Sequence, residues 1–181
     1  MSKIIPTIVL LISLNSCFTS SSHLSNDPNP KASAYNVQLG LAYLQQGDRQ
    51  RAKKKLLTAM AEAPHSPDAN GAMAYYFEST QDVQQADIYY RRAIQINPKE
   101  GASLNNYGAF LCRQARYDEA ERYFLKAAAD PKYTNIAQVY ENAGFCALAA
   151  KHLKMAKHFF QQALAEDPKL ARSSETLARL S

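Results

Sequence analysis

The side chains able to do covalent, acid–base or metal chemistry are three cysteines, four histidines and several paired carboxylates. His152 and His158 lie six residues apart, about 600° around a helix, so the two imidazoles point to different faces. Glu119 and Glu121 are two residues apart and diverge for the same reason. The sequence has no GxxxxGKS/T phosphate loop and no HExxH or CxxC metal pattern. We therefore expect no catalytic site, metal, cofactor or small-molecule substrate.

One cysteine sits in a processing motif. The run Leu14-Asn15-Ser16-Cys17 resembles a bacterial lipobox, in which an aliphatic residue and two small residues precede the cysteine that is lipidated. Lys3 and the apolar stretch Ile4–Leu14 are typical of a signal peptide. We expect residues 1–16 to be removed and Cys17 to carry the acyl chains. An ordinary secretory signal cut nearby and a retained membrane anchor are the alternatives.

Lipidation would hold the chain on a membrane, because each buried CH₂ contributes about 0.8 kcal/mol. Phe18 follows Cys17, and the absence of aspartate at that position favours the periplasmic face of the bacterial outer membrane. Residues 17–33 are rich in Ser, Thr, Asn and Pro, including Asp27-Pro28-Asn29-Pro30. Such a segment buries too little apolar area to fold, so we expect a flexible tether there.

A larger pattern recurs four times in the rest of the chain, at intervals of 34 to 36 residues. It opens with a small residue (Gly40, Ala74, Gly108, Gly144), and an alanine follows twelve residues later (Ala52, Ala86, Ala120, Ala156). Next come a bulky apolar residue (Leu56, Tyr90, Phe124, Phe160), another alanine (Ala59, Ala93, Ala127, Ala163) and a proline (Pro64, Pro98, Pro131, Pro168). Small residues let two helices pack closely, and proline stops a helix. The period indicates an all-α tetratricopeptide (TPR) solenoid of helix–turn–helix units.

Turn residues divide the pattern into helix pairs. We expect four repeats, 34–66, 67–100, 101–135 and 136–168, followed by a C-terminal capping segment, 169–181, with a short helix. The expected helices are Ala34–Gln46, Arg49–Glu62, Pro67–Thr80, Val83–Ile96, Gly101–Gln114, Tyr117–Ala129, Ile136–Ala149 and Leu153–Glu166. Two extra residues near 130–135 break the period, which predicts an enlarged loop on one edge of the solenoid.

The first helix of each repeat, helix A, is expected to line a concave groove that binds a partner. The groove residues expected from the register are Val37, Leu41, Leu44, Tyr75, Glu78, Asn105, Asn106, Ala109, Cys112, Arg113, Glu141, Phe145 and Leu148. This mostly apolar set suits an amphipathic helix or an extended apolar segment of another protein, and argues against an enzyme in the groove. TPR co-chaperones clamp a carboxylate with Lys and Asn at sites that are here Val37, Leu41, Ala72 and Ala102, so that function is not expected.

The two remaining cysteines, Cys112 and Cys146, fall on neighbouring A helices. An oxidising periplasm would permit a bridge between them. Their positions in the repeat differ, however, and free cysteine is a frequent small core residue. We therefore expect two free cysteines.

Basic residues gather on the second helix of the first repeat and on that of the last. They are Arg49, Arg51, Lys53, Lys54 and Lys55, then Lys151, Lys154 and Lys157. Attraction to anionic phospholipid or to an acidic partner is one interpretation, and a solvated convex face is the favoured one. The clusters lack interleaved stacking aromatics, so nucleic-acid binding is not expected.

One stretch is more specific than the general repeat. The runs Leu104-Asn105-Asn106-Tyr107-Gly108-Ala109-Phe110-Leu111-Cys112, Arg116-Tyr117-Asp118-Glu119-Ala120 and Tyr140-Glu141-Asn142-Ala143-Gly144 resemble the type IV pilus biogenesis/stability lipoproteins PilW and PilF, a family of TPR pilotins. The leader, Cys17 and the first repeat fit the same family, so the resemblance covers the whole chain. Members of that family usually carry six repeats, whereas we expect four.

The resemblance implies a non-enzymatic pilotin. Such a protein binds the outer-membrane secretin subunit of the type IV pilus and assists its localisation and multimerisation. Asn105, Asn106, Tyr107 and Phe110 are the contact residues expected within the matched run, with a place in the core as the alternative for Tyr107 and Phe110. The alternative is a general cell-envelope TPR lipoprotein that scaffolds other machinery, such as cell-wall enzymes, and the identity of the partner separates the two.

Overall fold

The computed structural model describes residues 27–180, and every regular element within them is an α-helix, which confirms the all-α prediction. The helices are α1 (Pro30–Gln45), α2 (Arg49–Glu62), α3 (Pro67–Ser79), α4 (Val83–Ile96), α5 (Gly101–Arg113), α6 (Tyr117–Ala128), α7 (Ile136–Ala149), α8 (Leu153–Glu166) and α9 (Ala171–Leu180). The bounds of α2, α4, α7 and α8 are those predicted from the sequence.

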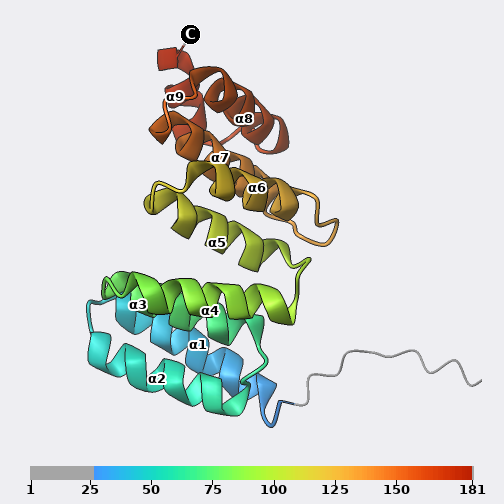
Figure 1. Cartoon of the computed structure of the whole chain (residues 1–181). Coiled ribbons are helices and arrows are strands. Elements are labelled where there is room, and N and C mark those ends of the chain that lie inside the picture. The colour runs from blue at the N-terminus through green and yellow to red at the C-terminus, as the bar shows by residue number, and fades with distance from the viewer. Residues whose placement is uncertain (1–26, 181) are drawn as a thin grey trace, which may run out of the picture.

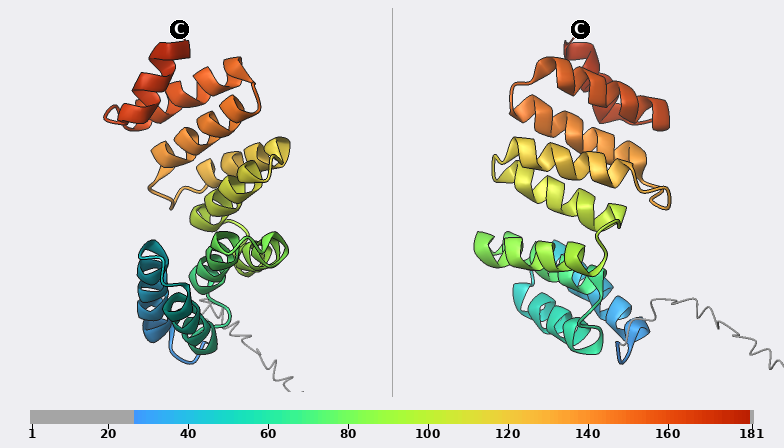
Figure 2. Two further views of the ribbon diagram at one scale, coloured as in Figure 1. Left: turned by 90° about the vertical axis from the view of Figure 1, so that its left-hand side faces the viewer. Right: turned by 45° about the vertical axis from the view of Figure 1, so that its right-hand side comes forward.

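Successive helices form hairpins, α1 with α2, α3 with α4, α5 with α6 and α7 with α8, and the hairpins stack into a twisted solenoid (Figures 1 and 2). The A helices are neighbours along the stack, because α1 contacts α3, α3 contacts α5 and α5 contacts α7. Helix α1 lies at one end of the stack and the C terminus at the other (Figure 1). One face of the solenoid is therefore built from successive A helices.

Small residues set the distance between the two helices of a hairpin. A Cβ at Gly108 would come within 2.9 Å of the Phe124 ring, and one at Gly144 within 2.7 Å of the Phe160 ring. Both rings are almost completely buried. The recurring alanines on the B helices are buried as well: Ala52, Ala86, Ala120, Ala156, Ala59, Ala93, Ala127 and Ala163. The repeat pattern therefore corresponds to an interlock of small residues with bulky ones.

Two buried clusters make up the core. One lies in repeats one and two around Leu56 and Met73, and the other extends from Ala74 to the C-terminal repeats. Phe77 on α3 and Tyr89 on α4 pack against both clusters, with their rings stacked at a centroid distance of 5.3 Å. Repeat two therefore joins the two halves of the core.

Each turn between helices A and B contains one residue in the left-handed region. Gly47 fills this position in the first repeat, with a φ of 78°. Gln81, Ala115 and Lys151 fill it in the others, with φ values of 64°, 56° and 63°. A residue with a Cβ loses roughly 1 kcal/mol in this conformation relative to glycine. Gln81, Ala115 and Lys151 therefore each make the fold less stable than glycine would at the same position.

The first helix begins four residues earlier than predicted. The Asn29 side chain accepts a hydrogen bond from the backbone of the first turn, and Pro30 follows at the first helical position, where its fixed φ is favourable. The Ser33 hydroxyl is buried and donates to the Ala59 carbonyl at 2.9 Å. The prediction of a tether extending to residue 33 is therefore wrong at its end, because Asn and Pro here form a helix cap.

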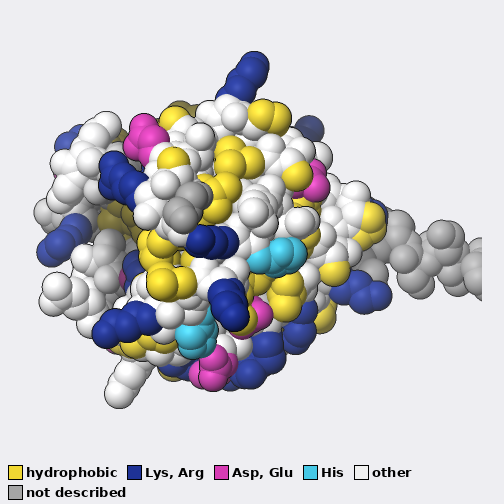
Figure 3. Space-filling view, turned by 90° about the horizontal axis from the view of Figure 1, so that it is seen from above, with side chains coloured by type: hydrophobic (Ala, Val, Ile, Leu, Met, Phe, Trp, Pro, Cys, Tyr) yellow, Lys and Arg dark blue, Asp and Glu magenta, His cyan; other side chains and the backbone are white. Residues whose placement is uncertain are grey.

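The C-terminal helix α9 packs against α8 and covers part of α7. The Ser173 hydroxyl donates to Glu141 Oε1 at 2.9 Å, and the Arg172 guanidinium lies 4.5 Å from the centroid of the Phe145 ring. Seen from this end, hydrophobic side chains gather near the middle of the surface, with Lys and Arg side chains projecting around them (Figure 3).

No helix within residues 27–180 combines the length and the apolar character needed to cross a membrane. The predicted signal peptide, Cys17 and the first part of the predicted tether lie in residues 1–26, outside the described residues.

Candidate partner-binding groove

A groove of about 390 Å³ lies on the face formed by α1, α3 and α5. Its walls are Val37, Leu41, Gln45, Pro67, Asp68, Gly71, Ala72, Tyr75, Tyr90, Ala102, Ser103 and Asn106, and we call this surface the A-helix groove. Four residues predicted from the register, Val37, Leu41, Tyr75 and Asn106, line it. The Tyr75 side chain is 45% exposed, so an aromatic surface is available to a partner.

The groove is open because α3 carries a glycine where the other A helices carry a side chain. Three residues before each helix crossing, the register gives Val37, Gly71, Asn105 and Glu141. Three of these side chains are buried. A Cβ at Gly71 would instead meet no atom within 4 Å. A larger side chain at Gly71 would therefore project into the A-helix groove.

An ion pair forms one rim of the groove and joins repeats two and three. The Tyr90 hydroxyl donates to Glu78 Oε2 at 3.0 Å, and Arg113 Nη2 donates to the same oxygen at 2.9 Å. Burial, with the nearby Glu78 carboxylate, raises the pKa of Tyr90 far above its ordinary value. Burial opposes the charge of Arg113, but its hydrogen bond to Glu78 outweighs this and raises the pKa of Arg113. Glu78 and Arg113, two of the three charged residues predicted for the groove, thus neutralise each other.

The opposite rim is acidic. Asp68 lines the groove at the start of α3. Glu100, just before α5, lies outside the groove walls but close enough to Asp68 for the two charges to interact. Burial raises the pKa of the Glu100 carboxyl, the Ser103 hydroxyl hydrogen-bonded to it opposes this, and the charges of Asp68 and Asp130 add to the rise. A partner segment would therefore meet apolar walls and negative charge at one side.

The enlarged loop predicted near 130–135 positions the start of α5. Helix α5 has no side-chain cap of its own, and Asp130 Oδ2 accepts a hydrogen bond from the Gly101 N–H at 2.8 Å instead. Backbone hydrogen bonds from Lys132 and Gly101 lower the pKa of Asp130. A Cβ at Gly101 would lie 2.5 Å from the Tyr133 ring. The loop therefore fixes the end of α5 that carries Ala102, a groove residue.

A larger hollow of about 900 Å³ lies beneath the same loop. The α4–α5 connection and the loop after α6 form its walls, and it shares Ala102 with the A-helix groove. The two concave surfaces therefore meet at the first turn of α5.

Several other predicted groove residues lie between helices. Asn105 accepts a hydrogen bond from the Asn142 side chain at 3.1 Å, and Glu141 is buried beneath α9. Partly buried against the core clusters are Leu44, Ala109, Phe145 and Leu148. Of the two places left open for Tyr107 and Phe110, the structure shows the core and not the contact surface, because both side chains are almost completely buried.

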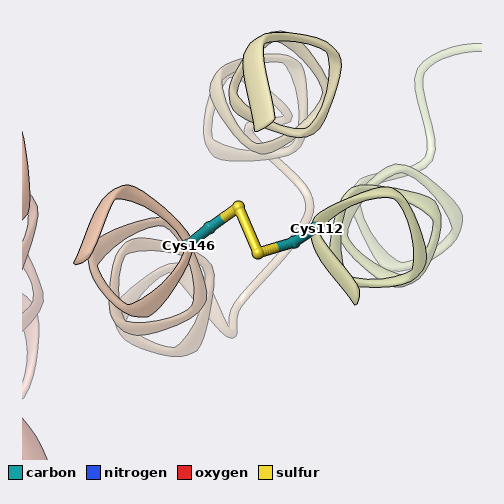
Figure 4. The surroundings of a disulfide bond; sticks show 2 residues. All are labelled: Cys112 and Cys146. Carbon is teal, nitrogen blue, oxygen red and sulfur yellow. A yellow bond between two sulfur atoms is a disulfide. The ribbon is translucent and has the colours of Figure 1, made fainter. Parts of the chain in front are cut away.

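Cys112 on α5 and Cys146 on α7 form a disulfide, with their Cα atoms 5.7 Å apart (Figure 4). The prediction of two free cysteines is therefore wrong. Neighbouring A helices face each other with opposite sides, so the residues that meet differ by about half a turn in register. Cys112 follows Gly108 by four residues and Cys146 follows Gly144 by two, a difference of about 200° around the helix and about 3 Å along it. The unequal register that argued against the bridge is what the bridge requires.

Besides Gln45 and Tyr90, the groove residues that the prediction from sequence missed include four near helix starts or in the register of α3: Pro67, Asp68, Gly71 and Ser103. Gly71 differs from the other three. The register contained the signal for Gly71, because it is the counterpart of the predicted residue Val37 in the next repeat. The other three lie in the first turns of α3 and α5, where the groove extends further toward the helix starts than expected.

The groove offers a surface for binding and few groups for reaction. Asp68 is the one ionisable carboxylate among its walls, and Tyr90 is held by its hydrogen bond to Glu78. In the described part of the chain, no group of three or more His, Cys, Asp or Glu side chains is placed to hold a metal ion. Binding of a protein segment is the function that these side chains support.

Comparison with known proteins identifies the repeats. Tetratricopeptide-repeat family models match residues 67–100 and 89–122. The type IV pilus assembly protein PilF of Pseudomonas aeruginosa is 36% identical over 164 residues, which is 86% of this chain and 63% of that protein. The chain therefore spans less than two thirds of the length of this relative. An uncharacterized protein of Haemophilus influenzae is 29% identical over 177 residues and 97% of both chains.

Two solved structures have the same arrangement of helices. The structure of Pseudomonas aeruginosa PilF matches with a TM-score of 0.77 and 36% identity, over 82% of this chain and 67% of that one. The structure of PilW, described as a widely conserved type IV pilus biogenesis factor, matches with a TM-score of 0.76 and 28% identity, over 83% of this chain and 69% of that one. The TPR fold predicted from the repeats is confirmed.

Proposed function

Because this chain belongs to the PilF/PilW family of TPR proteins, we propose that it is a non-enzymatic scaffold in type IV pilus biogenesis. The names of both relatives support a role in this process, since one is a pilus assembly protein and the other a pilus biogenesis factor. The A-helix groove supports the mechanism, and it is the observation that carries the proposal. It is an open concave surface with apolar walls, of the kind that holds a segment of another protein.

The partner that we propose is the secretin subunit, whose localisation and multimerisation this protein assists. Leu41, Ala72 and Tyr75 offer apolar contacts to one face of an amphipathic helix or to an extended segment. Asp68 and Glu100 favour a basic residue at the side of the segment that lies near the start of α3. The proposed ligand is thus an apolar segment with a flanking Lys or Arg.

We further propose that lipid on Cys17 anchors the protein to the periplasmic face of the outer membrane. The lipobox-like run before Cys17 and the apolar leader support this proposal. The anchor would hold the groove close to the membrane in which the secretin assembles.

The groove proposal is tested with two substitutions at Gly71. Gly71→Arg fills the groove, and Gly71→Ala leaves it open. Neither Cβ meets an atom within 4 Å, and both replacements favour a helix over glycine by up to about 1 kcal/mol, so the fold is kept. Each variant is expressed in a strain lacking the gene, and detergent-resistant secretin multimers and surface pili are measured. Cys17→Ala, expressed in the same way, tests the anchor.

We expect the deletion to lose multimers and pili, Gly71→Ala to restore them and Gly71→Arg to fail. Restoration by both variants would show that the groove is not the binding surface. Normal multimers and pili in the deletion strain would overturn the secretin assignment and favour a scaffold for other envelope machinery.

A further inference from the structure

Helix α2 holds most of the excess positive charge of this protein. Between Arg49 and Glu62 there are five basic residues and one acidic residue, a net +4, whereas the whole chain carries a formal net charge of +5. The rest of the chain is therefore close to neutral. Because the charge is concentrated on one helix, it creates a local positive surface that can attract anions, in addition to any general effect on solubility.

Two of these five basic residues already interact with other groups of the protein. Arg51 pairs with Asp48 at 2.5 Å and lies 4.5 Å from the centroid of the Tyr43 ring. Arg49 donates to the Ser79 carbonyl at 3.3 Å. Their guanidinium groups therefore help to hold the first hairpin and its neighbour together.

The remaining three, Lys53, Lys54 and Lys55, form no ion pair among residues 27–180. Lys53 and Lys54 are exposed, and Lys55 is partly exposed. Leu57 follows Lys54 by three residues and Lys53 by four, so it lies on the same side of the helix, with 52% of its surface exposed. The outer side of α2 thus combines free ammonium groups with an exposed apolar side chain.

This surface lies where the chain would meet a membrane. Helix α2 packs mainly on α1 and α3, at the end of the stack opposite the C terminus (Figure 1). The start of α1 is held beside the end of α2, because the Asn29 N–H donates to the Glu62 carbonyl at 3.0 Å. Cys17 and Asp27 are ten positions apart in the sequence, so the chain between them can span at most about 35 Å. A lipid on Cys17 would therefore keep α2, itself about 21 Å long, close to the bilayer.

We propose that the outer side of α2, formed by Lys53, Lys54 and Leu57, docks on the headgroups of anionic phospholipids. The ammonium groups bind lipid phosphates while Leu57 enters the boundary between headgroups and acyl chains. Helix α2 then lies along the membrane and the solenoid extends away from it, which gives the A-helix groove a fixed orientation toward the periplasm.

The test uses the full chain carrying Cys17→Ala, so that no acyl chain contributes to binding. Co-sedimentation is measured with vesicles of phosphatidylcholine alone and with equal parts of phosphatidylcholine and phosphatidylglycerol. Any binding through the apolar leader is common to both vesicles, so the ratio of the two affinities isolates the anionic lipid. One variant replaces Lys53 and Lys54 by Gln, and the matched control replaces Lys151 and Lys154 by Gln.

The control removes the same charge from a comparably exposed set at the other end of the stack. Glutamine is accommodated at residue 151, because Gln81 holds the equivalent left-handed turn position in repeat two. Circular dichroism checks that both variants keep their helices.

A lysine near an anionic surface strengthens binding about five-fold, so the α2 variant should lose about 25-fold in its preference for phosphatidylglycerol. The control should change by less than about five-fold, and added salt should weaken the wild type most. Equal losses in both variants, or no preference for phosphatidylglycerol in the wild type, would overturn the proposal. A preference that survives in the α2 variant would also overturn it and leave an acidic protein as the partner of this surface.

Discussion

Loss of the disulfide between Cys112 and Cys146 is expected to lower the free energy of unfolding by about 4 kcal/mol. The two cysteines are 34 residues apart in the sequence. In the chain-entropy model, a bridge across a loop of this length removes about 13 cal/mol/K from the unfolded chain, or about 3.8 kcal/mol at about 25 °C. The bridge joins α5 to α7 and encloses α6, so repeats three and four should lose most of the protection.

The assay is urea unfolding followed by circular dichroism, with and without a reductant. The variant carries both Cys112→Ala and Cys146→Ala, which removes the bridge and both of its thiols and leaves Cys17 as the remaining cysteine. Cys146 is almost completely buried, so the smaller alanine adds a packing loss of about 1 kcal/mol. The reduced wild type should therefore unfold slightly later than the variant, and reductant should not affect the variant.

Two results would refute this reasoning. One is an unchanged unfolding midpoint of the wild type when thiol titration shows that both cysteines are reduced. The other is hydrogen exchange that accelerates on reduction equally in α1 to α4 and in α5 to α7, since the bridge contacts only the latter group.

Three further predictions concern packing, turns and pH. Gly144→Ala should lower the free energy of unfolding by about 1–3 kcal/mol, measured by urea unfolding, because its Cβ would lie 2.7 Å from the buried Phe160 ring. Ala115→Gly should raise the thermal midpoint by a few degrees, because φ is 56° at this turn position and glycine removes the steric penalty, worth roughly 1 kcal/mol. At Asp87, burial is outweighed by hydrogen bonds from Arg91, Tyr107 and Arg116, which lower the pKa below its ordinary value. The stabilisation that the Asp87 carboxylate gives to the folded state is thus present above the ordinary pKa and is lost as pH falls through the pKa in the folded state. Asp87→Asn should therefore flatten the decline in the free energy of unfolding between about pH 5 and about pH 2.

The helices were predictable because the sequence signals that mark their boundaries recur in every repeat. Small residues at the crossings, bulky residues opposite them and polar turn residues recur in register, and the bounds of α2 and α8 follow from them without error. Agreement among several copies outweighs the weak preference of any single residue.

The site was less predictable, because it depends on how successive repeats sit on one another. Register places Asn105 and Glu141 on the A helices, but only the packing of the next A helix shows that they are buried. The register marks Gly71 as the counterpart of Val37, but only the structure shows that no neighbouring atom fills the space beside it.

The predictions of where α1 starts and of two free cysteines were wrong for a common reason. In both cases a local property, polar composition near Asn29 and unequal register of Cys112 and Cys146, was interpreted without the neighbouring helix that gives it meaning. Asn29 caps a helix that packs on α2, and the two cysteines meet because their helices face each other.

The central claim is that the A-helix groove holds a segment of the pilus secretin. It is tested most directly by placing the photoreactive amino acid p-benzoylphenylalanine at Tyr75, which is exposed and lines the groove. The control site is Leu125, a side chain on α6 of similar exposure that lies outside the groove. After irradiation of living cells, we expect the secretin subunit to be cross-linked from Tyr75 and not from Leu125. Cross-linking of the secretin from both sites alike, or of other proteins alone from Tyr75, would contradict the account.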